Sequence, residues 1–88
     1  MAYSIVYSEE AKRELRRRSQ RLRLELTRRV RALASDHEPP ESEELHDPWE
    51  GYRRLRVLGT LRVVYRVDHR VRLIDVVKIG GRGSIYEG

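Results

Sequence analysis

The chain contains no cysteine, which excludes a disulfide framework and a metal site built on thiolates. It also lacks the run of about 18 apolar residues that a membrane-spanning helix requires. Its start, Met1-Ala2-Tyr3-Ser4-Ile5, has neither the basic nor the apolar part of a secretory signal. These absences predict a cytoplasmic protein with no membrane partner, whose fold is stabilised by packing alone.

Charge is what the chain has in abundance. Charged residues make up 38% of its 88 residues and hydrophobic residues 39%, which is typical of a folded domain with a highly charged surface. A chain of this length can build about one layer of helix on one sheet, so residues 1–88 are expected to form a single domain.

Acidic and basic residues are segregated along the sequence. Residues 36–50 hold seven acidic side chains and no lysine or arginine, whereas residues 51–88 hold nine basic side chains and three acidic ones. Such a basic segment attracts phosphates, which indicates a nucleic acid as the binding partner. A bias of the source genome towards arginine is the alternative explanation, since lysine supplies only two of the 19 bases.

Hydrophobic periodicity predicts an α+β fold of two layers in the order β-α-α-β-β-β. A short strand over residues 3–7 leads to Ser8, which can cap a helix, and apolar spacings of three and four continue to Leu33. We expect two helices broken near Ser19, because one rod of about 27 residues could not fold back over so short a sheet. An acidic loop follows, and Leu45, Trp49 and the Pro48 turn are expected to attach its end to the core.

Three antiparallel strands then come near residues 52–57, 61–67 and 71–78. Short hairpin links join them, and Gly59 can take the positive φ that the first link needs. In the last strand, Val71 is expected on an apolar side together with Leu73 and Val77.

Arginines occupy alternate positions of these strands. A period of two places Leu55, Val57, Leu61, Val63, Tyr65 and Val67 on the core side, and Arg54, Arg56 and Arg62 on the opposite side. The arginine side has almost no acid in the predicted strands, which favours a polyanion as its ligand. Arg62 has a simpler alternative role, an ion pair with Asp75 on the neighbouring strand.

Several segments resemble the RelE/ParE superfamily, the toxins of bacterial type II toxin-antitoxin systems. The C-terminal half carries Arg54-Leu55-Arg56-Val57, a turn with glycine, Arg62-Val63-Val64-Tyr65, and Ile79-Gly80-Gly81-Arg82-Gly83-Ser84-Ile85-Tyr86. The opening is similar as well, with Tyr3-Ser4-Ile5, Ser8-Glu9-Glu10-Ala11 and Leu15, and Leu45 with Gly51-Tyr52 resembles the approach to the second strand. The resemblance spans nearly the whole chain and implies a RelE-like fold with a twisted antiparallel sheet.

The resemblance implies a toxin, and the arginines make it closer to the RelE-like mRNA interferases. Those members are ribosome-dependent endoribonucleases that inhibit translation, and the residues that match their site are Arg54, Arg56, Arg62, Arg82 and Tyr86. Fixed cations suit the cleavage, because attack by an RNA 2′-hydroxyl builds negative charge on the phosphorus. Two alternatives remain open: a ParE-like inhibitor of DNA gyrase without nuclease chemistry, and a catalytically weakened homologue.

The resemblance also implies partners: a cognate antitoxin in a hetero-oligomer, the ribosome with its mRNA, and ribosomal RNA bound by the basic surface. Neither a cofactor nor a metal is expected, since His37, His46 and His69 lack the spacing of metal ligands.

The general base is unassigned, because arginine cannot accept a proton at working pH. Tyr86, Glu50, His46 and Lys78 are the candidates. Tyr86 has packing in the core as its alternative role. Arg66, Arg70 and Arg72 are interpreted as docking or solvated charges.

Overall fold

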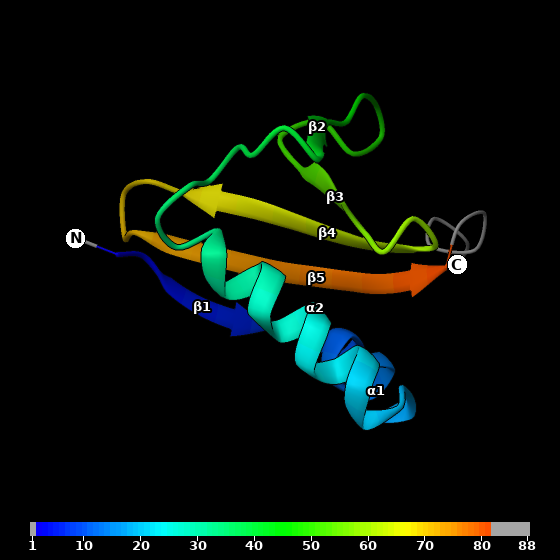
Figure 1. Ribbon diagram of the computed structural model, residues 1–88. Coiled ribbons are helices and arrows are strands. Elements are labelled where there is room, and N and C mark those ends of the chain that lie inside the picture. Colours follow the sequence, from blue (N-terminus) through cyan, green and yellow to red (C-terminus); the bar gives the residue numbers. More distant parts are fainter. Residues whose placement is uncertain (1, 82–88) are drawn as a thin grey trace.

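The computed structural model describes residues 2–81, which form two helices and a five-stranded sheet. The elements are β1 (Ser4–Tyr7), α1 (Glu9–Arg17), α2 (Gln20–Ala32), β2 (Ser42–Glu44), β3 (Arg53–Val57), β4 (Leu61–Asp68) and β5 (Leu73–Gly81). The strand order across the sheet is β1-β5-β4-β3-β2, and the helices cover one face (Figure 1). The predicted α+β fold of two layers is confirmed.

The helical region begins after Ser8 and is broken near Ser19, as the sequence predicts. Ser8 and Ser19 are both extended N-cap residues, and their hydroxyl oxygens accept hydrogen bonds from the backbone amides of Ala11 and Leu22 at 3.0 and 3.3 Å. Arg18, between the helices, is also extended. The break near Ser19 therefore comes from a serine cap and needs neither glycine nor proline.

The sheet differs from the expected one in two ways. The acidic loop contains the short strand β2, which pairs antiparallel with β3 along its outer edge. In addition, β1 pairs in parallel with β5, so the sheet is mixed, whereas we expected antiparallel strands. A strand of three residues such as Ser42-Glu43-Glu44 has no apolar alternation to reveal it, and its pairing depends on the free edge of β3.

Both hairpin links require positive φ angles. Gly59 has φ of 75° as predicted, and Leu58 before it has φ of 56°. Arg72 has φ of 55°, so β5 begins at Leu73, two residues later than expected. Val71 consequently lies in the turn and is 66% exposed, which makes its predicted place on the apolar side of the strand wrong.

The core lies between the helices and the sheet. Its fully buried members include Leu26, Val30 and Leu33 from the helical layer and Leu55, Val57, Val63, Tyr65, Ile74 and Val76 from the strands. The Tyr65 hydroxyl donates a hydrogen bond of 2.6 Å to the carbonyl of His37, just beyond α2. This bond lets a phenol lie in the core with its polar atom satisfied.

One half-buried and one fully buried tyrosine make the stability of the fold sensitive to alkaline pH. Burial raises the pKa of Tyr7 and of Tyr65. The positive charge of Arg31 lowers the pKa of Tyr7 by a smaller amount, and hydrogen bonds with Ser42 and Arg53 do the same for the pKa of Tyr65. The folded protein therefore holds these protons more tightly than the unfolded chain does. The free energy of unfolding should be unaffected by these groups below about pH 10 and should fall as pH rises through the raised values. Urea unfolding from pH 8 to 11 measures this, and Tyr7→Phe should reduce the fall. An equal decline in Tyr7→Phe and the parent protein would contradict the prediction for Tyr7.

Candidate functional site

Arg54, Arg56 and Arg62, here called the arginine face, lie on the side of the sheet opposite the core. The register of β3 and β4 places Arg56 directly across from Arg62, while Arg54 is across from Val64. Two like charges directly opposite each other on neighbouring strands destabilise a sheet. An anion bound between them would relieve that repulsion. The structure thus brings together three of the five predicted site residues, and Arg82 and Tyr86 lie outside the described residues.

Arg62 is the most enclosed of the three. It is 9% exposed, and its Nη1 atom donates hydrogen bonds to the carbonyls of Gly59 and Leu61 at 3.2 and 3.1 Å. These bonds fix the guanidinium against the β3–β4 turn. The alternative pairing of Arg62 with Asp75 is wrong, because the Asp75 carboxylate lies 3.5 Å from Arg66, its partner in the register of β4 and β5.

The arginine face is less free of acid than the sequence indicated. Pairing of β2 with β3 sets Glu43 opposite Arg54, and their side chains form an ion pair. The expectation of a face with almost no acid is therefore wrong, because the acidic segment supplies a strand that the sequence did not reveal. Arg56, in contrast, is exposed and has no carboxylate across from it on β4.

A pocket of about 510 Å³ adjoins the arginine face at Arg54. Apolar side chains from Leu45, Pro48 and Trp49 line it, together with polar ones from Glu43, Glu44, His46, Asp47 and Arg54. The Trp49 ring is half-buried and stands edge-on to Tyr52, with ring centroids 5.4 Å apart. The pocket thus combines an aromatic surface, an imidazole and a cation. The sequence pointed to Leu45 and Trp49 only as contacts of the loop end; the Pro48 turn between them was the available signal for a second hairpin.

Three of the four candidate general bases are among the described residues, and each lies in a different environment. His46 lines the pocket beside Arg54. The Lys78 ammonium lies 3.1 Å from the Glu10 carboxylate and 5.7 Å from the centre of the Trp49 ring, so it is already engaged. Glu50 is exposed and does not line the pocket.

The other two histidines lie apart from the pocket, at the β4–β5 turn and beyond α2. His69 shares a hydrogen bond of 2.7 Å with the Tyr3 hydroxyl, and the His37 ring packs 4.1 Å from the Tyr3 ring. Within residues 2–81, no cluster of three or more potential metal ligands is found.

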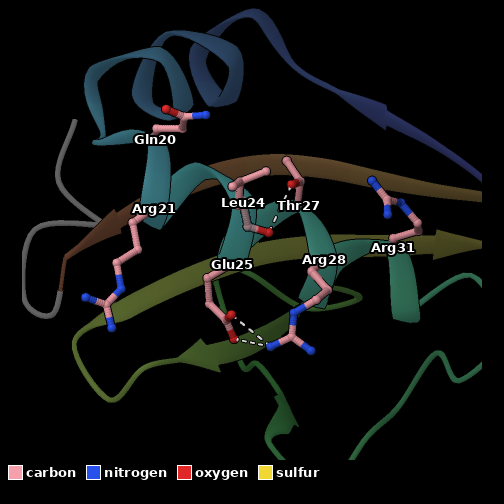
Figure 2. Close-up of a pocket in the computed structure, with 7 residues that line it drawn as sticks. All are labelled: Gln20, Arg21, Leu24, Glu25, Thr27, Arg28 and Arg31. Atoms are coloured by element: carbon pink, nitrogen blue, oxygen red, sulfur yellow. Dashed lines mark hydrogen bonds and ion pairs between the residues drawn. The ribbon is translucent and has the colours of Figure 1, made fainter.

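A second surface, here called the α2 groove, lies on the outer side of α2 and has a volume of about 580 Å³ (Figure 2). Leu24 is 62% exposed at its centre, and Arg21, Arg28 and Arg31 surround it. Arg28 donates two hydrogen bonds to Glu25 at 2.8 and 2.7 Å; they lower the pKa of that carboxyl and raise the pKa of the guanidinium. Arg21 and Arg31 extend from the helix without such a partner in Figure 2.

No helix in the described part of the chain is long and apolar enough to cross a membrane.

Solved structures of low sequence identity share this fold. The RelBE2 toxin-antitoxin complex from Mycobacterium tuberculosis contains a chain with TM-score 0.80 and 19% identity, over 93% of this chain and 100% of that one. The archaeal RelE-RelB complex from Pyrococcus horikoshii gives 0.79 and 22%, over 96% and 99%. The YoeB/ParE toxin from Agrobacterium tumefaciens gives 0.77 and 18%, over 90% and 98%. No significant match is found among curated proteins.

The family assignment comes from the sequence. Residues 5–86 match the model of the ParE toxin of type II toxin-antitoxin systems, parDE. The chain therefore belongs to this family of the RelE/ParE superfamily, as its motifs predicted, and is the toxin of a toxin-antitoxin system.

The burial of Arg62 predicts a structural cost for its removal. Arg62→Ala should lower the free energy of unfolding by about 1–3 kcal/mol, because the substitution removes two hydrogen bonds from a charged donor and the packing of a buried side chain. Arg56→Ala is the matched control, since Arg56 is exposed on the adjacent strand and should change stability by less than about 0.5 kcal/mol. Urea denaturation of the three proteins measures both values, and equal stability for the two variants would contradict the prediction.

Proposed function

We propose that this toxin is a ribosome-dependent mRNA endoribonuclease that inhibits translation and is neutralised by a cognate antitoxin. The observation that carries the proposal is the register of β3 and β4, which places Arg56 directly across from Arg62, with Arg54 two residues along β3. The adjoining Trp49 offers a ring on which an unpaired base can stack. Phosphate and base contacts therefore lie side by side, as a single-stranded RNA requires.

The chemistry follows from the fixed charges. The 2′-hydroxyl oxygen attacks the neighbouring phosphorus, a 2′,3′-cyclic phosphate forms, and the 5′-oxygen leaves. Negative charge grows on the phosphate oxygens in the transition state, and preorganised guanidinium groups stabilise it there more than in the ground state. Arg62 suits this role because its bonds to Gly59 and Leu61 hold it in place before RNA binds. Arg82 and Tyr86 complete the proposed site on the strength of the motif alone.

The second candidate is inhibition of DNA gyrase, which the match to the ParE family favours. Under that function the arginines would bind a protein or DNA surface and perform no chemistry. The catalytically weakened homologue stands as a variant of the first candidate. These functions differ in what the purified toxin does to two substrates, mRNA on the ribosome and supercoiled DNA.

Primer extension on mRNA from cells that express the toxin tests the proposal. We expect new 5′ ends within translated frames, and their yield should fall at least about 100-fold in Arg56→Ala, because an exposed cation of the transition-state site is lost without loss of stability. Arg70→Ala is the matched control, an exposed arginine at the far β4–β5 turn that should leave cleavage unchanged. Intact mRNA together with inhibited gyrase supercoiling would refute the nuclease and establish the second candidate.

The α2 groove supports the proposed antitoxin partner. An exposed leucine among arginines is complementary to an amphipathic, acidic segment, whose apolar residues would cover Leu24 and whose carboxylates would meet Arg21 and Arg31. Ribosomal RNA would instead meet the exposed arginines of α1, which are Arg13, Arg16 and Arg17.

Substitution in the α2 groove should weaken the antitoxin complex without affecting the proposed cleavage. Leu24→Ser combined with Arg31→Glu is expected to reduce affinity for the antitoxin about 100-fold, since it removes an apolar anchor and reverses one charge. Calorimetric titration of each toxin with the protein encoded beside it measures the change. The control is Arg13→Glu on α1, and an equal loss of affinity in the control would place the interface elsewhere.

A further inference from the structure

The arginine face stabilises charge but contains no group that can remove a proton. A guanidinium remains protonated at any working pH, so the attacking 2′-hydroxyl needs a separate base. Among the described residues, only a side chain that lies next to the arginine face can serve. Lys78 lies on the same side of the sheet, across from Val64, but its ammonium is paired with Glu10 at 3.1 Å. We therefore turn to the 510 Å³ pocket at Arg54.

The polar side chains that line the pocket differ in how well each could act as the general base. Glu43 is already paired with the Arg54 guanidinium. Glu44 and Asp47 are exposed carboxylates, and a carboxylate is in general a weaker base than an imidazole. His46 is the remaining polar residue, and imidazole is the side chain suited to accept and release protons near neutrality.

The position of His46 is fixed by its backbone. The Trp49 amide donates a hydrogen bond of 2.8 Å to the His46 carbonyl and closes a turn over residues 46–49. Bonds from Leu45 to the Tyr52 carbonyl at 2.9 Å, and from Tyr52 to the Trp49 carbonyl at 3.1 Å, attach this turn to the start of β3. The backbone of His46 is therefore held in place, and His46 and Arg54 line the same pocket.

The imidazole ring is also available. It is exposed, and within residues 2–81 no hydrogen bond or ion pair engages it. The charged groups that line the same pocket are Glu43, Glu44, Asp47 and Arg54.

We propose that His46 is the general base of the cleavage reaction. One imidazole nitrogen takes the proton of the 2′-hydroxyl as the bond from the 2′-oxygen to phosphorus forms. The bond from phosphorus to the 5′-oxygen breaks, and that oxygen takes a proton from solvent. This role rests on the proposed nuclease function and adds to it the proton acceptor that the arginines lack.

Single-turnover cleavage of mRNA on purified ribosomes, with the full-length toxin, tests the role. His46→Ala should lower the rate about 10²- to 10⁴-fold with no loss of ribosome binding. The parent enzyme should gain rate with pH and reach a plateau as a base loses its proton, and this rise should be absent from the variant. Added imidazole should restore part of the activity of His46→Ala and should not restore that of Arg56→Ala.

His69→Ala is the matched control, since His69 is an exposed histidine at the far β4–β5 turn and should retain full cleavage. Thermal unfolding of both variants at the parent temperature would establish that neither effect is a loss of fold. A parent toxin that cleaves, with His46→Ala within twofold of its rate and with the same pH dependence, would overturn the role of His46 and leave the nuclease function standing. A parent toxin that cleaves no mRNA would overturn both.

Discussion

Burial of β4 on both of its faces is the constraint on which the rest of the structure depends. The strand contributes Val63 and Tyr65 to the core, while Arg62 and Val64 on its other face are buried as well. Tyr65 fixes the end of the helical layer through its bond to the His37 carbonyl. Arg62 fixes one cation of the arginine face through the β3–β4 turn. The core and the candidate site are thus positioned by alternate residues of one strand, and a change in its register would disrupt both.

An irregularity in the pairing of β4 with β5 lets β4 bury residues on both of its faces while it stays paired with β5. The pairing shifts by one residue between Val64 and Tyr65, so that Tyr65 lies opposite Val76, and both are fully buried. The shift leaves Val77 without a residue across from it, and its carbonyl accepts a hydrogen bond of 2.8 Å from the Ser8 hydroxyl. Because the same hydroxyl caps α1, the irregularity in the sheet also anchors the first helix.

The features that the sequence predicted are those with a strong local cause. The Ser8 cap, the positive φ of Gly59 and the alternation of apolar residues in β3 and β4 are all decided within a few residues. The features it did not predict depend on distant segments. The register of β4 and β5 sets Arg62 opposite Gly80 and Arg66 opposite Asp75, so the pairing of Arg62 with Asp75 was wrong. The free edge of β3 turns Ser42-Glu43-Glu44 into a strand. His46 and Arg54 line one pocket because that strand pairs with β3, so the pocket could not be derived from spacing along the chain.

The carboxylates of the acidic segment, residues 36–50, pair with arginines of α2 and β3. Its carboxylates face arginines at three points: Glu41 with Arg29 and Glu38 with Arg53, each at 4.0 Å, and Glu43 with Arg54. All three carboxylates are more than half exposed, at 53%, 66% and 60%, and exposed pairs of this kind contribute little stability. Only the Glu43–Arg54 pair belongs to the arginine face, and Arg56 has no acid across from it on β4. Under the proposed nuclease function, an RNA phosphate would displace Glu43 from Arg54 at small cost, because the pair is exposed. Glu43 would then act as a competitor that a polyanion replaces more easily than a single anion does, since a polyanion would also contact Arg56 and the adjoining pocket.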